Sequence, residues 1–124
     1  MKRIIIDLDQ TLCYSDGDYV NARPNQAVID RLWEYRALGF EIVVHTSRNM
    51  RTYEGSIGKI NVHTLPMILE WLRRHGVEFD EVVVGKPWCG QQGFYVDDRA
   101  IRPDEFVSMT PEEVARLIFT SEAQ

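Results

Sequence analysis

Short apolar runs recur along the chain and are separated by longer segments in which apolar residues have a helical period. The runs contain many β-branched or aromatic residues, which favour strands. The clearest are Arg3–Ile6, Phe40–His45 and Glu81–Val84, and Phe94–Val96 is predicted as a fourth strand. A fifth, shorter strand is predicted over Glu105–Val107. This spacing predicts strands that alternate with helices.

Three intervening segments carry the signals of helices. Pro24–Leu38 is followed by Gly39 at the position of a helix C-cap, and a second helix begins at Thr64 and ends before Gly76. Thr110–Glu113 forms a capping box with proline at the first helical position, and it opens a last helix that runs to about Thr120. The expected inward residues of the three helices are Val28, Ile29, Leu32 and Trp33; Leu65, Ile68, Leu69 and Leu72; and Val114, Leu117 and Ile118.

Alternating strands and helices predict an α/β fold. We expect a three-layer, Rossmann-like domain with a parallel sheet and helices on both faces. The chain of 124 residues favours a single domain that spans residues 1–124. Thr11–Phe40 holds only a short loop and one helix, so no large cap domain is expected there. Arg48–Val62 is polar, contains two glycines and lacks a clean period, which favours a loop or lid.

Composition narrows the classes of function. The formal net charge of -5 argues against nucleic acid as a partner. No segment approaches the ~20 apolar residues of a membrane span, and Ile4–Ile6 is too short for a signal peptide. Cys13 and Cys89 lack metal-ligand spacing, and we interpret both as free thiols. The expected location is the cytoplasm, with no membrane partner.

Polar residues follow four of the predicted strands. Asp7-Leu8-Asp9-Gln10-Thr11 comes after the first, and Thr46-Ser47-Arg48 after the second. Gly85-Lys86-Pro87 follows the third, and Asp97-Asp98-Arg99 follows the fourth. Each group alone is compatible with a solvated turn. Together they are significant, because ligands of parallel sheets bind beyond the carboxyl ends of the strands.

These four motifs, in this order, resemble those of the haloacid dehalogenase superfamily. The match covers Asp7, Asp9 and Thr11, then Thr46, Lys86 and the pair Asp97/Asp98. Segments such as YVNARPN, HTSRNMRTYEGSIGKIN and GKPWCGQQGFYVDDRAIRPDEF further resemble small members linked to capsular or lipopolysaccharide sugar biosynthesis. Gln10 departs from the glycine that many members carry, at a position without proposed chemistry.

The resemblance implies a magnesium-dependent phosphatase. Asp7 would attack phosphorus and form an aspartyl-phosphate, while Asp9 would protonate the leaving alcohol and later activate water. Thr46 and Lys86 would bind the phosphoryl oxygens. The expected Mg²⁺ ligands are the Asp7 carboxylate, the Asp9 backbone carbonyl and Asp98, with Asp97 acting through a water or from outside the ligand set.

Further residues are candidates for substrate binding. Thr11 closes the first motif, and Ser47 is an alternative to Thr46. The basic candidates are Arg48, Arg51, Lys59 and Arg99. For Arg48 and Arg99 an ion pair with a neighbouring carboxylate is an equally open interpretation. His45 is expected in the core or behind the site, His63 and His75 on the surface, Trp33 and Trp71 in the core, and Trp88 at a rim.

Several other functions compete with this hypothesis. A phospho-accepting receiver domain has similar residues, but its acidic pair comes early and its lysine last. A dehalogenase needs neither the second carboxylate nor a metal. A phosphomutase usually needs a cap domain. A phosphatase that acts on a macromolecular substrate is a further alternative. The expected substrate is a small sugar or polyol phosphate of surface-polysaccharide biosynthesis, and a homo-oligomer is one state that we consider.

Overall fold

The computed structural model describes the backbone of residues 1–123 and the side chains of residues 1–119. It forms two compact units, Met1–Trp88 and a second unit that begins at Cys89. The elements of the first unit are β1 (Arg3–Ile6), β2 (Cys13–Tyr14), β3 (Arg23–Pro24), α1 (Gln26–Ala37), β4 (Glu41–Thr46), α2 (Ile57–His63), α3 (Leu65–Arg74) and β5 (Glu81–Val84). The second unit holds α4 (Pro103–Ser108) and α5 (Pro111–Ala123).

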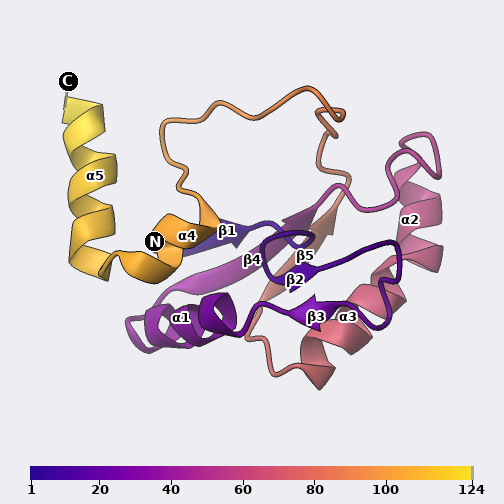
Figure 1. The fold of residues 1–124 in the computed structure, drawn as a ribbon, viewed down its shortest axis with the longest axis horizontal. Coiled ribbons are helices and arrows are strands. Elements are labelled where there is room, and N and C mark those ends of the chain that lie inside the picture. The colour runs from indigo at the N-terminus through magenta and orange to yellow at the C-terminus, as the bar shows by residue number, and fades with distance from the viewer. Residues whose placement is uncertain (124) are drawn as a thin grey trace. The chain divides into compact units, whose positions relative to one another are not determined.

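The first unit is built on a parallel sheet with the strand order β1-β4-β5. Ile5 lies opposite Val43, and Val43 lies opposite Glu81. The strands β1 and β4 are joined through α1, and β4 and β5 through α2 and α3. Two right-handed crossovers in the same direction place α1 and α3 on one face of the sheet, as Figure 1 shows. The structure therefore confirms a small α/β fold with a parallel sheet.

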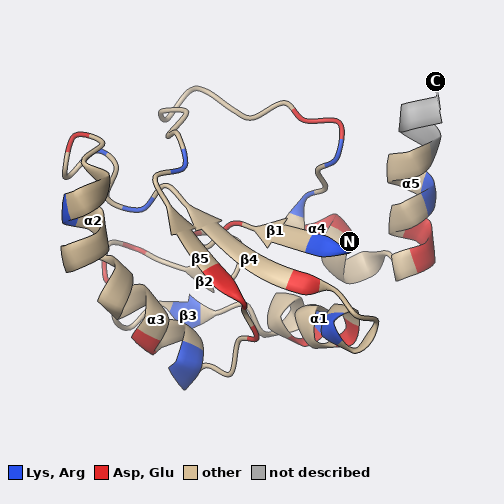
Figure 2. Cartoon of the chain, turned by 180° about the vertical axis from the view of Figure 1, so that it is seen from behind, with Lys and Arg blue, Asp and Glu red and all other residues tan. Residues whose placement is uncertain are grey.

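The core lies between this face and the helices. Alternate strand residues point toward it, so Ile6, Ile42 and Val44 are buried while Ile5 is exposed. The helices contribute the buried residues Val28, Ile29, Leu32, Ile60, Ile68 and Leu72. The first residues of β4 and β5 are both acidic, namely Glu41 and Glu81, and are red in Figure 2.

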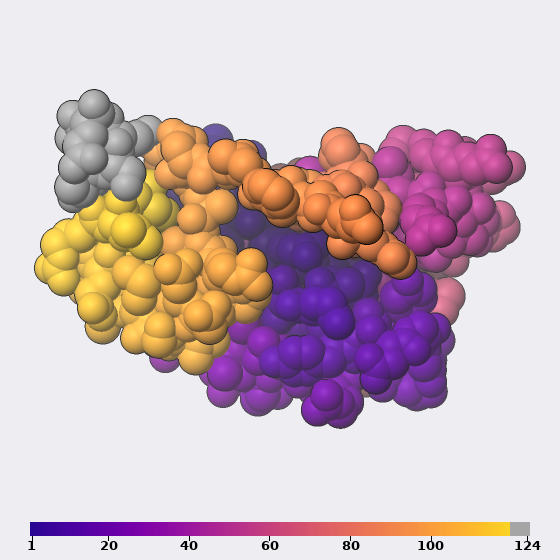
Figure 3. Space-filling model, turned by 45° about the horizontal axis from the view of Figure 1, so that its top comes forward, coloured from indigo at the N-terminus to yellow at the C-terminus, as the bar shows by residue number. Residues whose placement is uncertain are grey.

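The segment between β1 and α1 forms a hairpin rather than a cap domain. β2 and β3 pair antiparallel, with Cys13 opposite Pro24, and this pairing delays the start of α1 to Gln26. Trp71 of α3 donates its indole N–H to the Ala22 carbonyl at 2.9 Å, which fixes the hairpin to the core. Figure 3 shows this segment, in indigo to violet, at the molecular surface.

Two predicted strands are wrong. Phe94–Val96 forms no strand, and the side chains of Phe94 and Val96 are 79% and 88% exposed. Its β-branched and aromatic composition does not suffice, because a strand needs hydrogen-bond partners along its edge. Glu105–Val107 lies in α4, where Pro103 starts the helix and the Glu105 carboxylate accepts the Arg102 N–H at 2.9 Å. Local capping outweighs strand propensity there.

Three further expectations need correction. Trp33 is 48% exposed rather than core, and its indole N–H reaches the Gly76 carbonyl at 3.1 Å. The polar segment Arg48–Val62 is not all loop, because α2 begins at Ile57 behind an N-cap at Ser56. His75 is half-buried, and its ring lies tilted by 40° against the Trp71 ring with the centroids 4.4 Å apart, so it is not a plain surface residue.

Other expectations are confirmed. Trp71 is buried, and Cys13 and Cys89 are both free thiols. The capping box of the last helix is present, since the Thr110 N–H reaches the Glu113 carboxylate and the Glu113 N–H reaches the Thr110 hydroxyl. Across residues 1–123, none of the helices has the length and apolar character needed to cross a bilayer.

Candidate active site

Asp7 directly follows β1, and its carboxylate faces Lys86. The Lys86 Nζ lies 3.7 Å from the Asp7 Oδ1. Burial raises the pKa of Asp7 above 3.8, although the nearby Lys86 ammonium and the Leu8 N–H oppose this effect, while the charge of Asp9 adds to it. The site thus places the Lys86 ammonium beside a half-buried carboxylate, and this ammonium can attract an anionic group.

The backbone holds Lys86 in place. β5 ends at Val84, and Gly85 has a φ of +88°, a value that favours glycine. The Lys86 N–H then donates to the Thr46 carbonyl at 3.1 Å. The turn after β5 is therefore tied to the end of β4, and the structure brings three predicted residues, Asp7, Thr46 and Lys86, to one end of the sheet.

Thr46 is the last residue of β4 and is 1% exposed. Its hydroxyl oxygen accepts the Arg48 N–H at 3.0 Å. This bond shapes the turn that follows β4 and leaves the hydroxyl hydrogen available for another acceptor.

Asp9 binds Arg48 through two parallel contacts. The Arg48 Nη2 is 2.7 Å from the Asp9 Oδ1, and the Nε is 3.1 Å from the Oδ2. Ser15 donates its hydroxyl to the same Oδ1 at 2.9 Å, and Tyr19 lies with its ring centroid 4.1 Å from the Arg48 guanidinium carbon. Of the two interpretations left open for Arg48, the structure therefore shows the ion pair.

The thiol of Cys13 lies behind this pair. Its Sγ is 3.5 Å from the Asp9 Oδ1 and 3.8 Å from the Arg48 Nη2. Burial, followed by the charge of Asp9, raises the pKa of Cys13 to about 12, so the thiol stays protonated at neutral pH. Ser15, Tyr19 and Cys13 were not predicted from sequence, because it is the hairpin that returns them to Asp9.

The remaining candidates of the first unit are less closely tied to these groups. Thr11 sits in the turn after Asp9, where its N–H bonds the Leu8 carbonyl, and Ser47 is half-buried. Arg51 and Lys59 are exposed, and neither forms an ion pair with a described residue.

The second unit carries the acidic pair. The Asp97 carboxylate accepts the Arg99 N–H at 2.8 Å and so closes the local turn. Asp97, Asp98 and Arg99 are all exposed, and the Arg99 guanidinium lies over the Phe119 ring at 5.6 Å. This aromatic contact does not decide between the two interpretations left open for Arg99.

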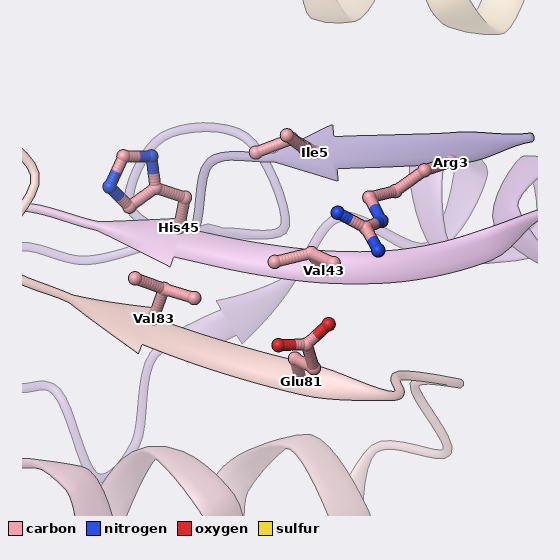
Figure 4. A pocket seen from close by; sticks show the side chains of 6 residues that line it. All are labelled: Arg3, Ile5, Val43, His45, Glu81 and Val83. Carbon is pink, nitrogen blue, oxygen red and sulfur yellow. The ribbon is translucent and has the colours of Figure 1, made fainter. Parts of the chain in front are cut away.

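His45 lies on the face of the sheet that α1 and α3 leave open. Figure 4 shows it among the six residues that line a pocket on this face, together with Arg3, Ile5, Val43, Glu81 and Val83. Burial and the Lys86 charge lower the pKa of His45, whereas the Asp7 charge raises it. The expectation of a histidine behind the site fits this neighbourhood, but the pocket itself lies on the sheet face and not at the strand ends.

Comparison with known proteins gives a relative but no function. No family model matches the sequence, and no curated protein is significantly similar to it. The crystal structure of an MCSG target from Vibrio cholerae is similar over 97% of this chain and 98% of its own, with 59% identity and a TM-score of 0.94. At this identity and coverage, the chain belongs to the same protein family as the Vibrio cholerae protein.

Proposed function

We propose that the protein is a magnesium-dependent phosphomonoester hydrolase that acts through an aspartyl-phosphate on Asp7. The observation that carries this proposal is the 3.7 Å approach of the Lys86 ammonium to the Asp7 carboxylate. Lys86 is held there by its backbone bond to Thr46, and Asp9 lies two residues from Asp7. A carboxylate nucleophile, a second carboxylate, a hydroxyl and a cation at one sheet end are the groups that phosphoryl transfer needs.

Each residue has a role that its environment supports. The Asp7 carboxylate attacks phosphorus while the Lys86 ammonium and the Thr46 hydroxyl bind the phosphoryl oxygens. Asp9 donates a proton to the leaving alcohol, which breaks the phosphorus–oxygen bond and leaves the phosphoryl group on Asp7. Asp9 then takes a proton from water, which attacks the phosphorus, breaks its bond to the Asp7 oxygen and releases inorganic phosphate with the Asp7 carboxylate restored.

The residues present suit Mg²⁺, which prefers oxygen ligands. The Asp9 side chain is bound by Arg48, so its main-chain carbonyl is the proposed ligand, beside the Asp7 carboxylate and Asp98. Asp97 already closes a turn with the Arg99 N–H, which supports Asp98 as the direct ligand of the pair. Among the described residues, no cluster of three acidic, cysteine or histidine side chains forms. When bound, the ion neutralises the substrate and the nucleophile.

We further propose a small sugar or polyol phosphate of surface-polysaccharide biosynthesis as the substrate, handled in the cytoplasm. Arg51 and Lys59 are exposed cations on the segment that follows Thr46, and Gly55 adopts a φ of +77° there. This segment would enclose a small anionic substrate, alone or with a second subunit. Nucleic acid and membranes are not proposed as partners.

The test is a phosphate-release screen over sugar, polyol and nucleotide phosphates and a phosphopeptide, with Mg²⁺ or with EDTA. We expect turnover of small phosphates with Mg²⁺ only, and its loss in Asp7→Asn, which keeps the shape but removes the nucleophile. The control is Arg73→Met, which changes an exposed arginine on α3.

Three outcomes count against the proposal. Turnover that survives in Asp7→Asn refutes the nucleophile. Stable capture of one phosphoryl group without release points to a receiver domain, and preference for the phosphopeptide refutes the substrate class.

A further inference from the structure

Arg48 is a buried charged residue, with 6% of its surface exposed. A buried guanidinium is costly unless its donors are paired. Its partner Asp9 is less buried, with 25% of the side chain exposed against 3% for Arg48. The arginine therefore lies behind the carboxylate, and the carboxylate separates it from solvent.

Contacts at both ends fix Arg48. Its backbone N–H bonds the Thr46 hydroxyl, and its Nε and Nη2 meet the two oxygens of Asp9. The Tyr19 ring covers the guanidinium face at 4.1 Å, a distance at which a cation and a ring attract each other. A side chain with so little freedom can hold its partner in one rotamer, because the planar fork of arginine matches a carboxylate.

We propose that Arg48 is a positioning residue that holds the Asp9 carboxylate for proton transfer and does not itself bind the substrate phosphate. This inference rests on the proposed function, since it gives a partner to the proposed acid and base. Asp9 would contact the leaving group, and Arg48, assisted by the Ser15 hydroxyl at 2.9 Å, would set the direction of its carboxylate.

Direct phosphate binding by Arg48 is the competing interpretation. It would require the guanidinium to leave Asp9 or to bind phosphate through its remaining nitrogen. The geometry opposes both, because Nε and Nη2 are on Asp9, Tyr19 covers a face and only 3% of the side chain is exposed. Lys86 is the better phosphate ligand, since 22% of its side chain is exposed.

The test compares Asp9→Asn, Arg48→Met and the double variant on an alkyl phosphate and on nitrophenyl phosphate, whose leaving group needs no proton. Asp9→Asn should lose roughly 10²–10⁴-fold in kcat on the alkyl phosphate and much less on the nitrophenyl ester. Arg48→Met should show the same leaving-group pattern with a loss of about 10²-fold, the effect of a misplaced group. The double variant should be no slower than Asp9→Asn, because the arginine would act only through the carboxylate.

Two further measurements keep the test decisive. Arg48→Lys should recover part of the rate, because a single ammonium keeps the charge but not the fork. If Arg48→Met unfolds, the double variant replaces it, because removing both charges leaves no unpaired partner. Arg73→Met, an exposed arginine over the Phe79 ring at 6.0 Å, is the control.

The outcomes separate this inference from the proposed function. Equal losses on both substrates, weaker inhibition by inorganic phosphate and additive loss in the double variant would overturn the positioning role and favour direct phosphate binding. A wild-type protein that turns over neither substrate would overturn the proposed function, and the role of Arg48 with it.

Discussion

The turn at Gly85 offers the sharpest link between backbone conformation and activity. Gly85 has a φ of +88°, and a Cβ added there would lie 2.3 Å from the Ile57 Cδ1. Gly39 has a similar φ of +93°, but an added Cβ would meet nothing within 4 Å. Alanine at either position has to adopt a conformation that L residues avoid, at a cost of about 1–2 kcal/mol. The two glycines therefore make a matched pair.

Gly85→Ala should destabilise the protein more than Gly39→Ala. The contact involves the free end of Ile57, which is 44% exposed and able to turn away, so we expect an excess of about 1 kcal/mol, the low end of overpacking costs. Because Lys86 is the next residue, Gly85→Ala should also displace the ammonium from Asp7 and lower kcat by up to about 10²-fold. Gly39→Ala should keep full activity.

Thermal and denaturant unfolding measure the stability terms, and phosphate release measures the rate. Adding Ile57→Val to Gly85→Ala removes the clashing Cδ1. The double variant should regain the stability lost to the clash but not the stability lost to the unfavourable backbone conformation. Equal losses in the two alanine variants, with unchanged turnover in both, would refute the reasoning. An excess that persists in Gly85→Ala with Ile57→Val would place its cause outside the Ile57 contact.

Three further predictions follow from other sites. Burial raises the pKa of Asp7, so the folded state binds this proton more tightly than the unfolded state does, and stability falls as pH rises from 3.8 through the raised pKa. In metal-free protein, Asp7→Asn should therefore raise thermal stability more at pH 7 than at pH 4. A gain independent of pH would contradict this. Asp98→Asn should raise the Mg²⁺ concentration that gives half-maximal rate, as measured by a metal titration of phosphate release, and an unchanged titration would remove Asp98 from the ligand set. Trp71→Phe should lower the free energy of unfolding by about 1–3 kcal/mol, because it deprives the buried Ala22 carbonyl of its donor. Trp33→Phe removes a similar bond at the exposed Gly76 carbonyl and should change the free energy of unfolding by about 0.5 kcal/mol or less. Equal effects of the two substitutions in urea unfolding would count against burial as the cause.

The sequence predicted the elements whose signals are local. β1, β4 and β5 are β-branched runs bounded by polar residues, and the last helix carries its own capping box, so neighbouring residues suffice to specify them. Phe94–Val96 has the same composition and still forms no strand, and Glu105–Val107 is helical. The first case lacks a neighbouring strand to pair with, and the second has a helix cap. Strand propensity takes account of neither.

The parallel α/β order and the placement of Asp7, Asp9, Thr46 and Lys86 after strands can be predicted from the sequence, and parallel pairing brings the carboxyl ends of those strands to one edge. Which of these groups touch depends on the tertiary structure. It paired Lys86 with Asp7, and it paired Arg48 with Asp9 under the ring of Tyr19. Arg48 and Asp9 are 39 residues apart, and Tyr19 arrives through the hairpin, so no local pattern encodes their contact. The physical reason is that burying an unpaired guanidinium is costly, so Arg48 pairs with the carboxylate that the fold brings next to it.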